Sequence, residues 1–175
     1  MDQHELNAFN EAVLPQLDAA YNLARWLTRN DSDAQDVVQE SFIRALRYFD
    51  RLKGTEARPW LLGIVRNNCY TWLDEQRRRP GHVEFDEEVM ESPAVLPQAA
   101  PSDPGAILDG MRQRARVDAA IRALAPPFRE VIVLRELEDL SYAEIAQVAS
   151  IPIGTVMSRL SRARAELKAA LADAA

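Results

Sequence analysis

The last part of the sequence concentrates residues that can bind nucleic acid. Helical spacing places its basic side chains on the outward face of one helix: Arg159, Arg162, Arg164 and Lys168. Thr155 and Ser158 lie in the first turns of the same helix, and their hydroxyls are small enough to approach a DNA backbone or a base edge. From charge alone, a solvated basic face at the end of a helical bundle remains an alternative.

The segment before this helix favours DNA binding over that alternative. Ser141-Tyr-Ala-Glu144 forms a capping box, in which a hydroxyl and a carboxylate satisfy backbone N–H groups at a helix start. A short helix over 142–149 follows, then the turn Ser150-Ile151-Pro152, then a helix over 154–171. This order predicts a helix-turn-helix, which places the start of its second helix in the major groove.

A second mixture of aromatic and basic residues occupies positions 58–79. Its members are Trp60, Tyr70, Trp72, Arg58, Arg66 and Arg77, with Asn67 and Asn68 between them. Aromatic and cationic side chains on one surface can stack on and follow single-stranded nucleic acid. The competing interpretation is that the tryptophans belong to the core, and the residues alone favour it.

Asp36, Gln39 and Glu40 share one face of the helix expected after Asn30-Asp31-Ser32-Asp33. An acidic face of this kind is ordinarily solvated. A partner-binding surface is the other possibility, and spacing does not decide between the two.

The remaining periodicity is also helical, which predicts an all-α fold without strands. Further helices are expected over 6–27, with a bend at Pro15, and over 59–79, 111–124 and 126–137. Asn30-Asp31-Ser32-Asp33 supplies N-cap residues for the helix that follows.

The net charge of −6 is concentrated in the middle of the chain. Residues 81–111 carry seven acidic residues and no Lys or Arg, and residues 80–110 hold half of the ten prolines. We therefore expect two small helical domains, 1–80 and 112–175, joined by a flexible acidic linker over 81–111.

The sequence argues against several classes of protein. It has no Gly-rich phosphate loop and no Ser/His/Asp or Cys/His set, so we expect no enzyme, no small-molecule substrate and no cofactor. The carboxylates are all assigned to helix surfaces. His4, His82 and Cys69 lack ligand spacing, so no metal is expected.

The expected location is the cytoplasm, with no membrane association. No apolar run approaches the roughly 20 residues of a membrane span, and the N-terminus lacks a signal core. The single cysteine, Cys69, fits a reducing compartment. Cys69 is interpreted as a buried structural thiol, with a redox sensor as the alternative.

Two stretches resemble the sigma-70 family, in particular its short extracytoplasmic-function (ECF) group. DAQDVVQESFIRALRYFD, followed by PWLLGIVRNNCYTWLDEQRRR, is similar to region 2 of these factors. LAPPFREVIVLRELEDLSYAEIAQVASIPIGTVMSRLSRARAEL is similar to region 4. The resemblance implies an RNA polymerase sigma factor with a region 2-like bundle over 1–80 and a region 4-like helix-turn-helix over 112–175. Such a factor directs core polymerase to promoters and is usually held by an anti-sigma factor.

The resemblance also implies roles for individual residues. Asp36, Gln39 and Glu40 would bind the coiled coil of the polymerase β′ subunit. The −10 element would be melted and read by one basic and amide-rich set: Lys53, Arg58, Arg66, Asn67, Asn68 and Arg77. The −35 element would be read by a second set: Thr155, Ser158, Arg159, Arg162 and Arg164.

Two positions depart from the family pattern. Many relatives have Arg or Lys where Met157 stands, and an aromatic or basic residue where Ser161 stands. These departures leave the −35 sequence open. An ordinary dimeric helix-turn-helix regulator is the main alternative, and binding to core polymerase separates it from a sigma factor.

Overall fold

The computed structural model describes residues 1–52, 54, 56–81 and 103–173. The described residues are helical or lie in turns, and no strand occurs among them. Lys53 and residues 82–102 of the expected linker lie outside the described residues. None of the described helices combines the length and the apolar character that a bilayer crossing requires.

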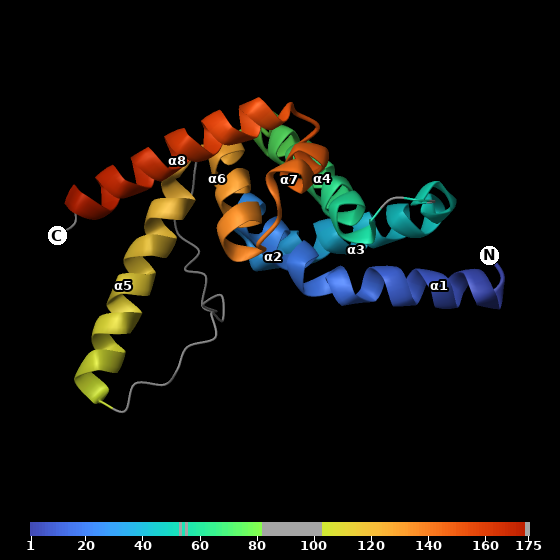
Figure 1. Ribbon diagram of the computed structural model, residues 1–175, viewed down its shortest axis with the longest axis horizontal. Helices are drawn as coiled ribbons and strands as arrows, with labels where there is room; N and C mark the ends of the chain where they lie inside the picture. Colours follow the sequence, from blue (N-terminus) through green and yellow to red (C-terminus); the bar gives the residue numbers. More distant parts are fainter. Residues whose placement is uncertain (53, 55, 82–102, 174–175) are drawn as a thin grey trace.

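Four α-helices form the N-terminal part of the molecule (Figure 1). They are α1 (Gln3–Val13), α2 (Leu17–Thr28), α3 (Asp31–Arg47) and α4 (Ala57–Arg78). The predicted bend at Pro15 is confirmed, because a 3₁₀ turn over Leu14–Gln16 separates α1 from α2. The predicted N-cap of α3 is also confirmed: Asn30 Oδ1 accepts a hydrogen bond from the Asp33 N–H at 2.9 Å.

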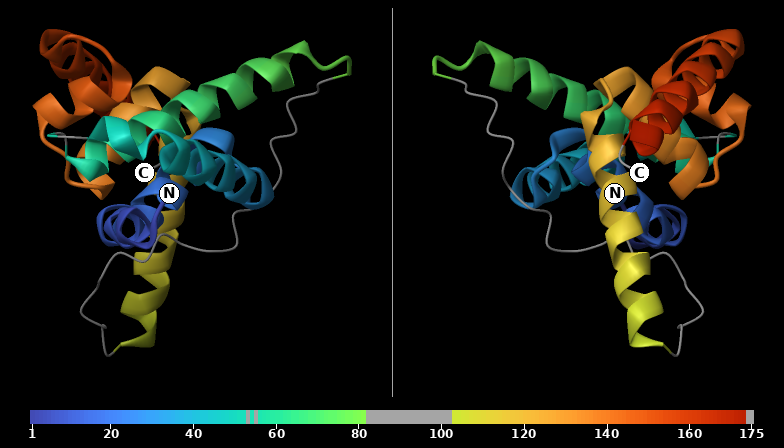
Figure 2. Two further views of the ribbon diagram at one scale, coloured as in Figure 1. Left: turned by 90° about the vertical axis from the view of Figure 1, so that its right-hand side faces the viewer. Right: turned by 90° about the vertical axis from the view of Figure 1, so that its left-hand side faces the viewer.

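The C-terminal part contains α5 (Pro104–Ala123), α6 (Pro126–Ile132), α7 (Tyr142–Ala149) and α8 (Ile153–Asp173). A π-helical turn over Val133–Leu137 extends α6. The helix α8 packs against α5, α6 and α7. Figure 1 and Figure 2 show that the first turns of α5 extend away from the other helices.

The start of α5 differs from the sequence prediction. Residues 104–111, expected in the linker, form its first two turns. Asp103 caps the helix, since its Oδ1 accepts a hydrogen bond from the Gly105 N–H at 3.1 Å, and Pro104 occupies the first position. Gly105 and Gly110 lower the intrinsic helix propensity of this segment, and they masked the periodicity in the sequence.

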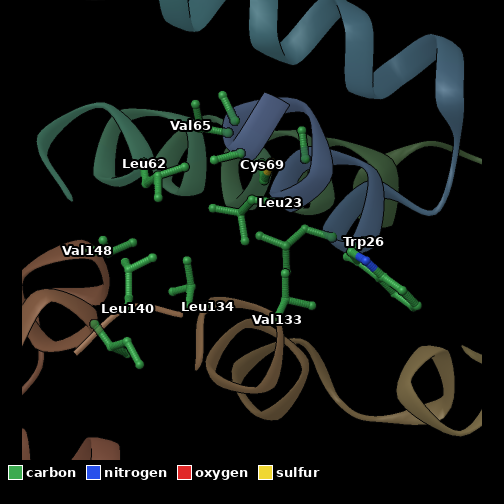
Figure 3. Packing of buried hydrophobic residues seen from close by; sticks show 14 of the residues in the cluster. Leu23, Trp26, Leu62, Val65, Cys69, Val133, Leu134, Leu140 and Val148 are labelled. Atoms are coloured by element: carbon green, nitrogen blue, oxygen red, sulfur yellow. The ribbon is translucent and has the colours of Figure 1, made fainter. Parts of the chain in front are cut away.

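One continuous apolar core joins the two parts of the molecule. The helix α4 packs against α7, and α2 packs against α6. Figure 3 shows Leu62 of α4 facing Val148 of α7, with Leu23 of α2 above Leu134. Complete burial of each such side chain stabilises by about 1.5–3 kcal/mol. This apolar burial is the main force that holds the two parts together.

Candidate nucleic-acid and partner-binding surfaces

The predicted helix-turn-helix is present at α7 and α8. Ser141 Oγ accepts a hydrogen bond from the Glu144 N–H at 3.1 Å, and Glu144 Oε2 accepts one from the Ser141 N–H at 2.7 Å. This capping box fixes the start of α7. Ser150 then adopts a left-handed conformation, with a φ of 54°, and turns the chain into α8.

The buried side of α8 is formed by Val156, Leu160 and Ala163. Ser158 therefore faces outward and is exposed, while Thr155 is half-buried beside it. The Ser158 hydroxyl donates to the Thr155 carbonyl at 3.1 Å. The start of α8 thus presents small polar groups at the position that enters a major groove in a helix-turn-helix.

The three arginines of the −35 set differ in their surroundings. Arg162 is exposed and lies 4.9 Å from the ring centroid of Phe128. Arg164 is also exposed, and its Nη2 lies 2.7 Å from Glu136 Oε1. Arg159 is half-buried, with its Nη1 3.9 Å from Glu130 Oε1. Only Arg162 and Arg164 therefore stand at the surface in this arrangement.

Glu130 of α6 forms an ion pair with Arg66 of α4, and this pair connects the two parts of the molecule. Its side chain is 0% exposed, although the sequence analysis assigned every carboxylate to a helix surface, and that assignment is wrong here. Arg66 of α4 donates from Nε to Glu130 Oε2 at 3.0 Å and from Nη2 to Oε1 at 3.3 Å. The Arg66 guanidinium also lies 4.0 Å from the ring centroid of Tyr70.

Burial and pairing act in opposite directions on these charges. Burial raises the pKa of Glu130, and the attraction of Arg66 only partly offsets it. For Arg66, burial acts to lower the pKa, but the hydrogen bond and charge of Glu130 outweigh it and raise the pKa. Because desolvation offsets much of the attraction of a buried ion pair, this pair contributes less to holding the two parts together than its short distances suggest.

Glu138 forms a second polar contact between the two parts. Arg58 donates through Nη2 to the backbone carbonyl of Glu138 and lies 3.3 Å from Glu138 Oε2. Asn22 of α2 donates to Oε1 of the same carboxylate at 2.6 Å. Two arginines of the −10 set, Arg58 and Arg66, are therefore bound to carboxylates of the C-terminal part.

The other members of the −10 set lie apart from one another. Asn67 is exposed on α4, and Arg77 is exposed near its end, 3.9 Å from Asp74. Asn68 is only 7% exposed and donates to Ser41 Oγ at 2.9 Å. Asn68 therefore fastens α4 to α3 and does not reach the surface, which corrects its placement in a DNA-binding set.

The aromatic residues of α4 belong to the packing of the protein. Trp60, Tyr70 and Trp72 are half-buried against the core. Their buried sides pack against the core and the remainder stays accessible, so a contact of their accessible sides with nucleic acid stays a prediction.

The face of α3 expected to bind a partner is open. Asp36, Gln39 and Glu40 are all exposed, and Glu40 pairs with Arg44 of the same helix at 3.1 Å. Beside Gln39 lies a mainly apolar groove of about 410 Å³ between α2 and α3. It is lined by Leu17, Asp18, Tyr21, Gln35, Val38, Gln39 and Phe42. The groove has no signal in the sequence, because side chains of two separate helices build it.

Cys69 is fully buried, as expected for a structural thiol. Burial raises its pKa to about 12, so the reactive thiolate is scarce at neutral pH. Within the described part of the chain, no three His, Cys, Asp or Glu side chains converge as a metal site.

Two family models match the chain, one in its N-terminal part and one in its C-terminal part. Residues 12–79 match Sigma-70 region 2, and residues 114–167 match Sigma-70 region 4. The chain is 36% identical to the ECF RNA polymerase sigma factor SigE of Mycolicibacterium smegmatis over 171 residues, covering 98% of the chain and 64% of that protein. It is 40% identical over 136 residues to the ECF RNA polymerase sigma-E factors of Salmonella typhimurium and Escherichia coli, covering 75% of the chain and 70% of each relative.

Two solved structures share the fold. RpoE of Bartonella quintana, crystallised with the anti-sigma factor NepR, superposes with a TM-score of 0.68 at 27% identity, covering 94% of this chain and 96% of that chain. CnrH, in complex with the cytosolic domain of CnrY, superposes with a TM-score of 0.64 at 27% identity, covering 97% and 90%. With both regions present in order, the chain belongs to the ECF group of the sigma-70 family of RNA polymerase sigma factors.

Proposed function

We propose that this protein binds core RNA polymerase, directs it to promoters with −10 and −35 elements, and so initiates transcription. The observation that carries the proposal is that a region 2 module and a region 4 module occur in order in one chain. Three features support the proposal: an exposed polar face on α3, an exposed Asn67 on α4, and a helix-turn-helix at α7 and α8.

The proposed −35 contact uses the start of α8. In a helix-turn-helix this end of the second helix lies in the major groove, while basic residues contact the flanking phosphates. Thr155 and Ser158 are placed for the groove, and Arg162 and Arg164 for the phosphates. Arg159 joins them once it is released from Glu130.

The proposed −10 contact uses α4. Asn67 is the residue that would capture a base turned out of the duplex, a step that costs a few kcal/mol of stacking. Arg58 and Arg66 would support it through phosphates, but both are bound to Glu138 and Glu130 here. The two modules must therefore separate before α4 can bind promoter DNA.

Separation is compatible with the length of the chain. The two promoter elements lie about 70 Å apart if they are separated by two turns of DNA at ~34–36 Å each. The segment from Arg78 to Pro104 reaches about 85 Å when extended at ~3.3 Å per residue. The modules can thus contact both elements at once in the open form.

Core polymerase is the proposed partner that favours the open form. Its β′ coiled coil would dock on Asp36, Gln39 and Glu40, beside the groove between α2 and α3. The test is an affinity measurement with purified core polymerase, comparing wild type with the double variant Asp36→Ala/Gln39→Ala. We expect at least a tenfold loss of affinity, and Glu75→Ala, which removes an exposed carboxylate from α4, serves as the matched control. Equal affinity of all three proteins would remove the docking assignment.

Regulation by an anti-sigma factor is part of the proposal. It is supported by the similar structure in which the sigma factor RpoE is bound to the anti-sigma factor NepR. In the second similar structure, CnrH is bound to the cytosolic domain of CnrY. A factor whose partners are polymerase and promoter DNA acts in the cytoplasm.

A further inference from the structure

The start of α8 exposes two large apolar side chains in the middle of the proposed −35 surface. Ile153 is 50% exposed and Met157 is 54% exposed. They are four residues apart, so they lie next to each other on the same flank of the helix. Single exposed apolar residues are common, but these two adjoin at the end of the helix that a helix-turn-helix inserts into DNA.

The neighbouring residues allow a close approach at this point. Gly154, Ser158 and Ser161 are exposed beside the two apolar residues, and all three are small. A Cβ added to Gly154 would meet nothing within 4 Å. Beside these small residues, Met157 is the longest of the exposed side chains at the start of the helix.

The charges around this patch fit DNA better than an apolar protein helix. Arg162, Arg164 and Lys168 follow on the same helix and are exposed. Basic residues that continue along the helix beyond the patch can contact the phosphates beside a major groove. An occupant that fits both features presents an apolar group with negative charge beside it.

The floor of the major groove offers one such group, the C5 methyl of thymine. Neither Ile153 nor Met157 can donate a hydrogen bond to the O6 and N7 acceptors of guanine. We propose that Ile153 and Met157 read thymine methyl groups in the −35 element, so that this factor selects thymine through apolar contact. This inference rests on the proposed function and names its sequence preference.

The experiment begins with selection of active promoters. Wild-type protein and core polymerase transcribe a library randomised over both elements, and the enriched −35 sequences are read. At the thymines selected, deoxyuridine is then substituted, which removes the methyl group and leaves the hydrogen-bonding groups of the base intact. We expect about fourfold weaker holoenzyme binding for each contacted methyl, which corresponds to about 0.8 kcal/mol.

The variants assign the effect to the two side chains. With Met157→Ala or Ile153→Ala, the thymine and deoxyuridine templates should bind equally at the position that each residue contacts. Met157→Leu, which keeps an apolar side chain, should retain the difference. A selected −35 element without thymine on either strand, or a wild-type protein that binds both templates equally, overturns the inference. Absence of any protein-dependent transcript from the library removes the proposed function itself, and the inference with it.

Discussion

Arg66 Nε lies 3.0 Å from Glu130 Oε2, and this contact joins the two modules of the protein. The Glu130 side chain is 0% exposed and that of Arg66 is 19% exposed. A guanidinium proposed to hold a phosphate is thereby paired with a carboxylate of the same chain. Arg58 is likewise paired with Glu138, so under the proposed function neither arginine is available to promoter DNA in this closed arrangement of the modules.

A reversible disulfide tests whether the modules must separate. A Cβ on Gly63 of α4 would lie 3.9 Å from the Cα of Val148 on α7, which is close enough for a Gly63→Cys/Val148→Cys bridge. We expect the oxidised variant to support less than a tenth of the run-off transcription of its reduced form. Cys69 can remain, because it is fully buried.

Each single cysteine variant is the control for that experiment, since neither can form the intramolecular bridge. Their transcription should not depend on the reductant. Full activity of the oxidised double variant would show that the modules need not separate.

The pH dependence of stability tests the balance at Glu130. Because burial raises the pKa of Glu130 above its ordinary value of 4.5, the folded chain takes up this proton more readily than the unfolded chain. The charged carboxylate therefore costs stability above the raised pKa, and that cost is relieved as the pH falls through it. In thermal melts from pH 7.5 to 4.5, the Tm of wild type minus that of Glu130→Gln should increase as the pH falls.

A Tm difference between wild type and Glu130→Gln that shrinks as the pH falls would contradict a raised pKa of Glu130. If the Tm difference decreases on acidification, Arg66 and Arg159 hold the pKa of Glu130 below its ordinary value. The ion pair would then stabilise the closed form on its own.

Asn67 and Asn68 are neighbours in the sequence with different expected roles. Asn68→Ala removes the buried hydrogen bond to Ser41 and should lower the free energy of unfolding by about 1–3 kcal/mol in urea titrations. Asn67→Ala changes an exposed residue and should alter that free energy by less than about 0.5 kcal/mol. In contrast, Asn67→Ala should impair promoter opening, measured by permanganate reactivity of unpaired thymines.

Each variant is the control for the other. Asn67→Ala should leave stability unchanged, whereas Asn68→Ala should lower it. A stable Asn68→Ala protein would contradict the packing role of Asn68. An Asn67→Ala protein that opens promoters normally would contradict the −10 assignment.

Local patterns predicted most of the helices. The capping box at Ser141 and the N-cap at Asn30 depend on groups within three residues, so the sequence displays them directly. The start of α5 at Pro104 was missed because Gly105 and Gly110 weaken its helical pattern. The polymerase- and DNA-binding roles of individual residues were predicted from the family resemblance, because helical periodicity alone does not assign them.

The contacts between the modules could not be predicted in this way. Arg66 and Glu130 are 64 positions apart, and Arg58 and Glu138 are 80 positions apart. An acidic residue on an amphipathic helix is ordinarily solvated, so neither glutamate stood out in the sequence. The burial of Asn68 likewise depends on how α4 packs on α3, which only the folded chain reveals.

Run-off transcription with purified core polymerase tests the central claim most directly. Templates selected from a randomised promoter library would be transcribed with and without the protein, and the 5′ ends of the products mapped. The account predicts promoter-specific transcripts that require this protein and are lost with Asp36→Ala/Gln39→Ala. A protein that never binds core polymerase, and instead binds duplex DNA alone as a dimer, would contradict the account.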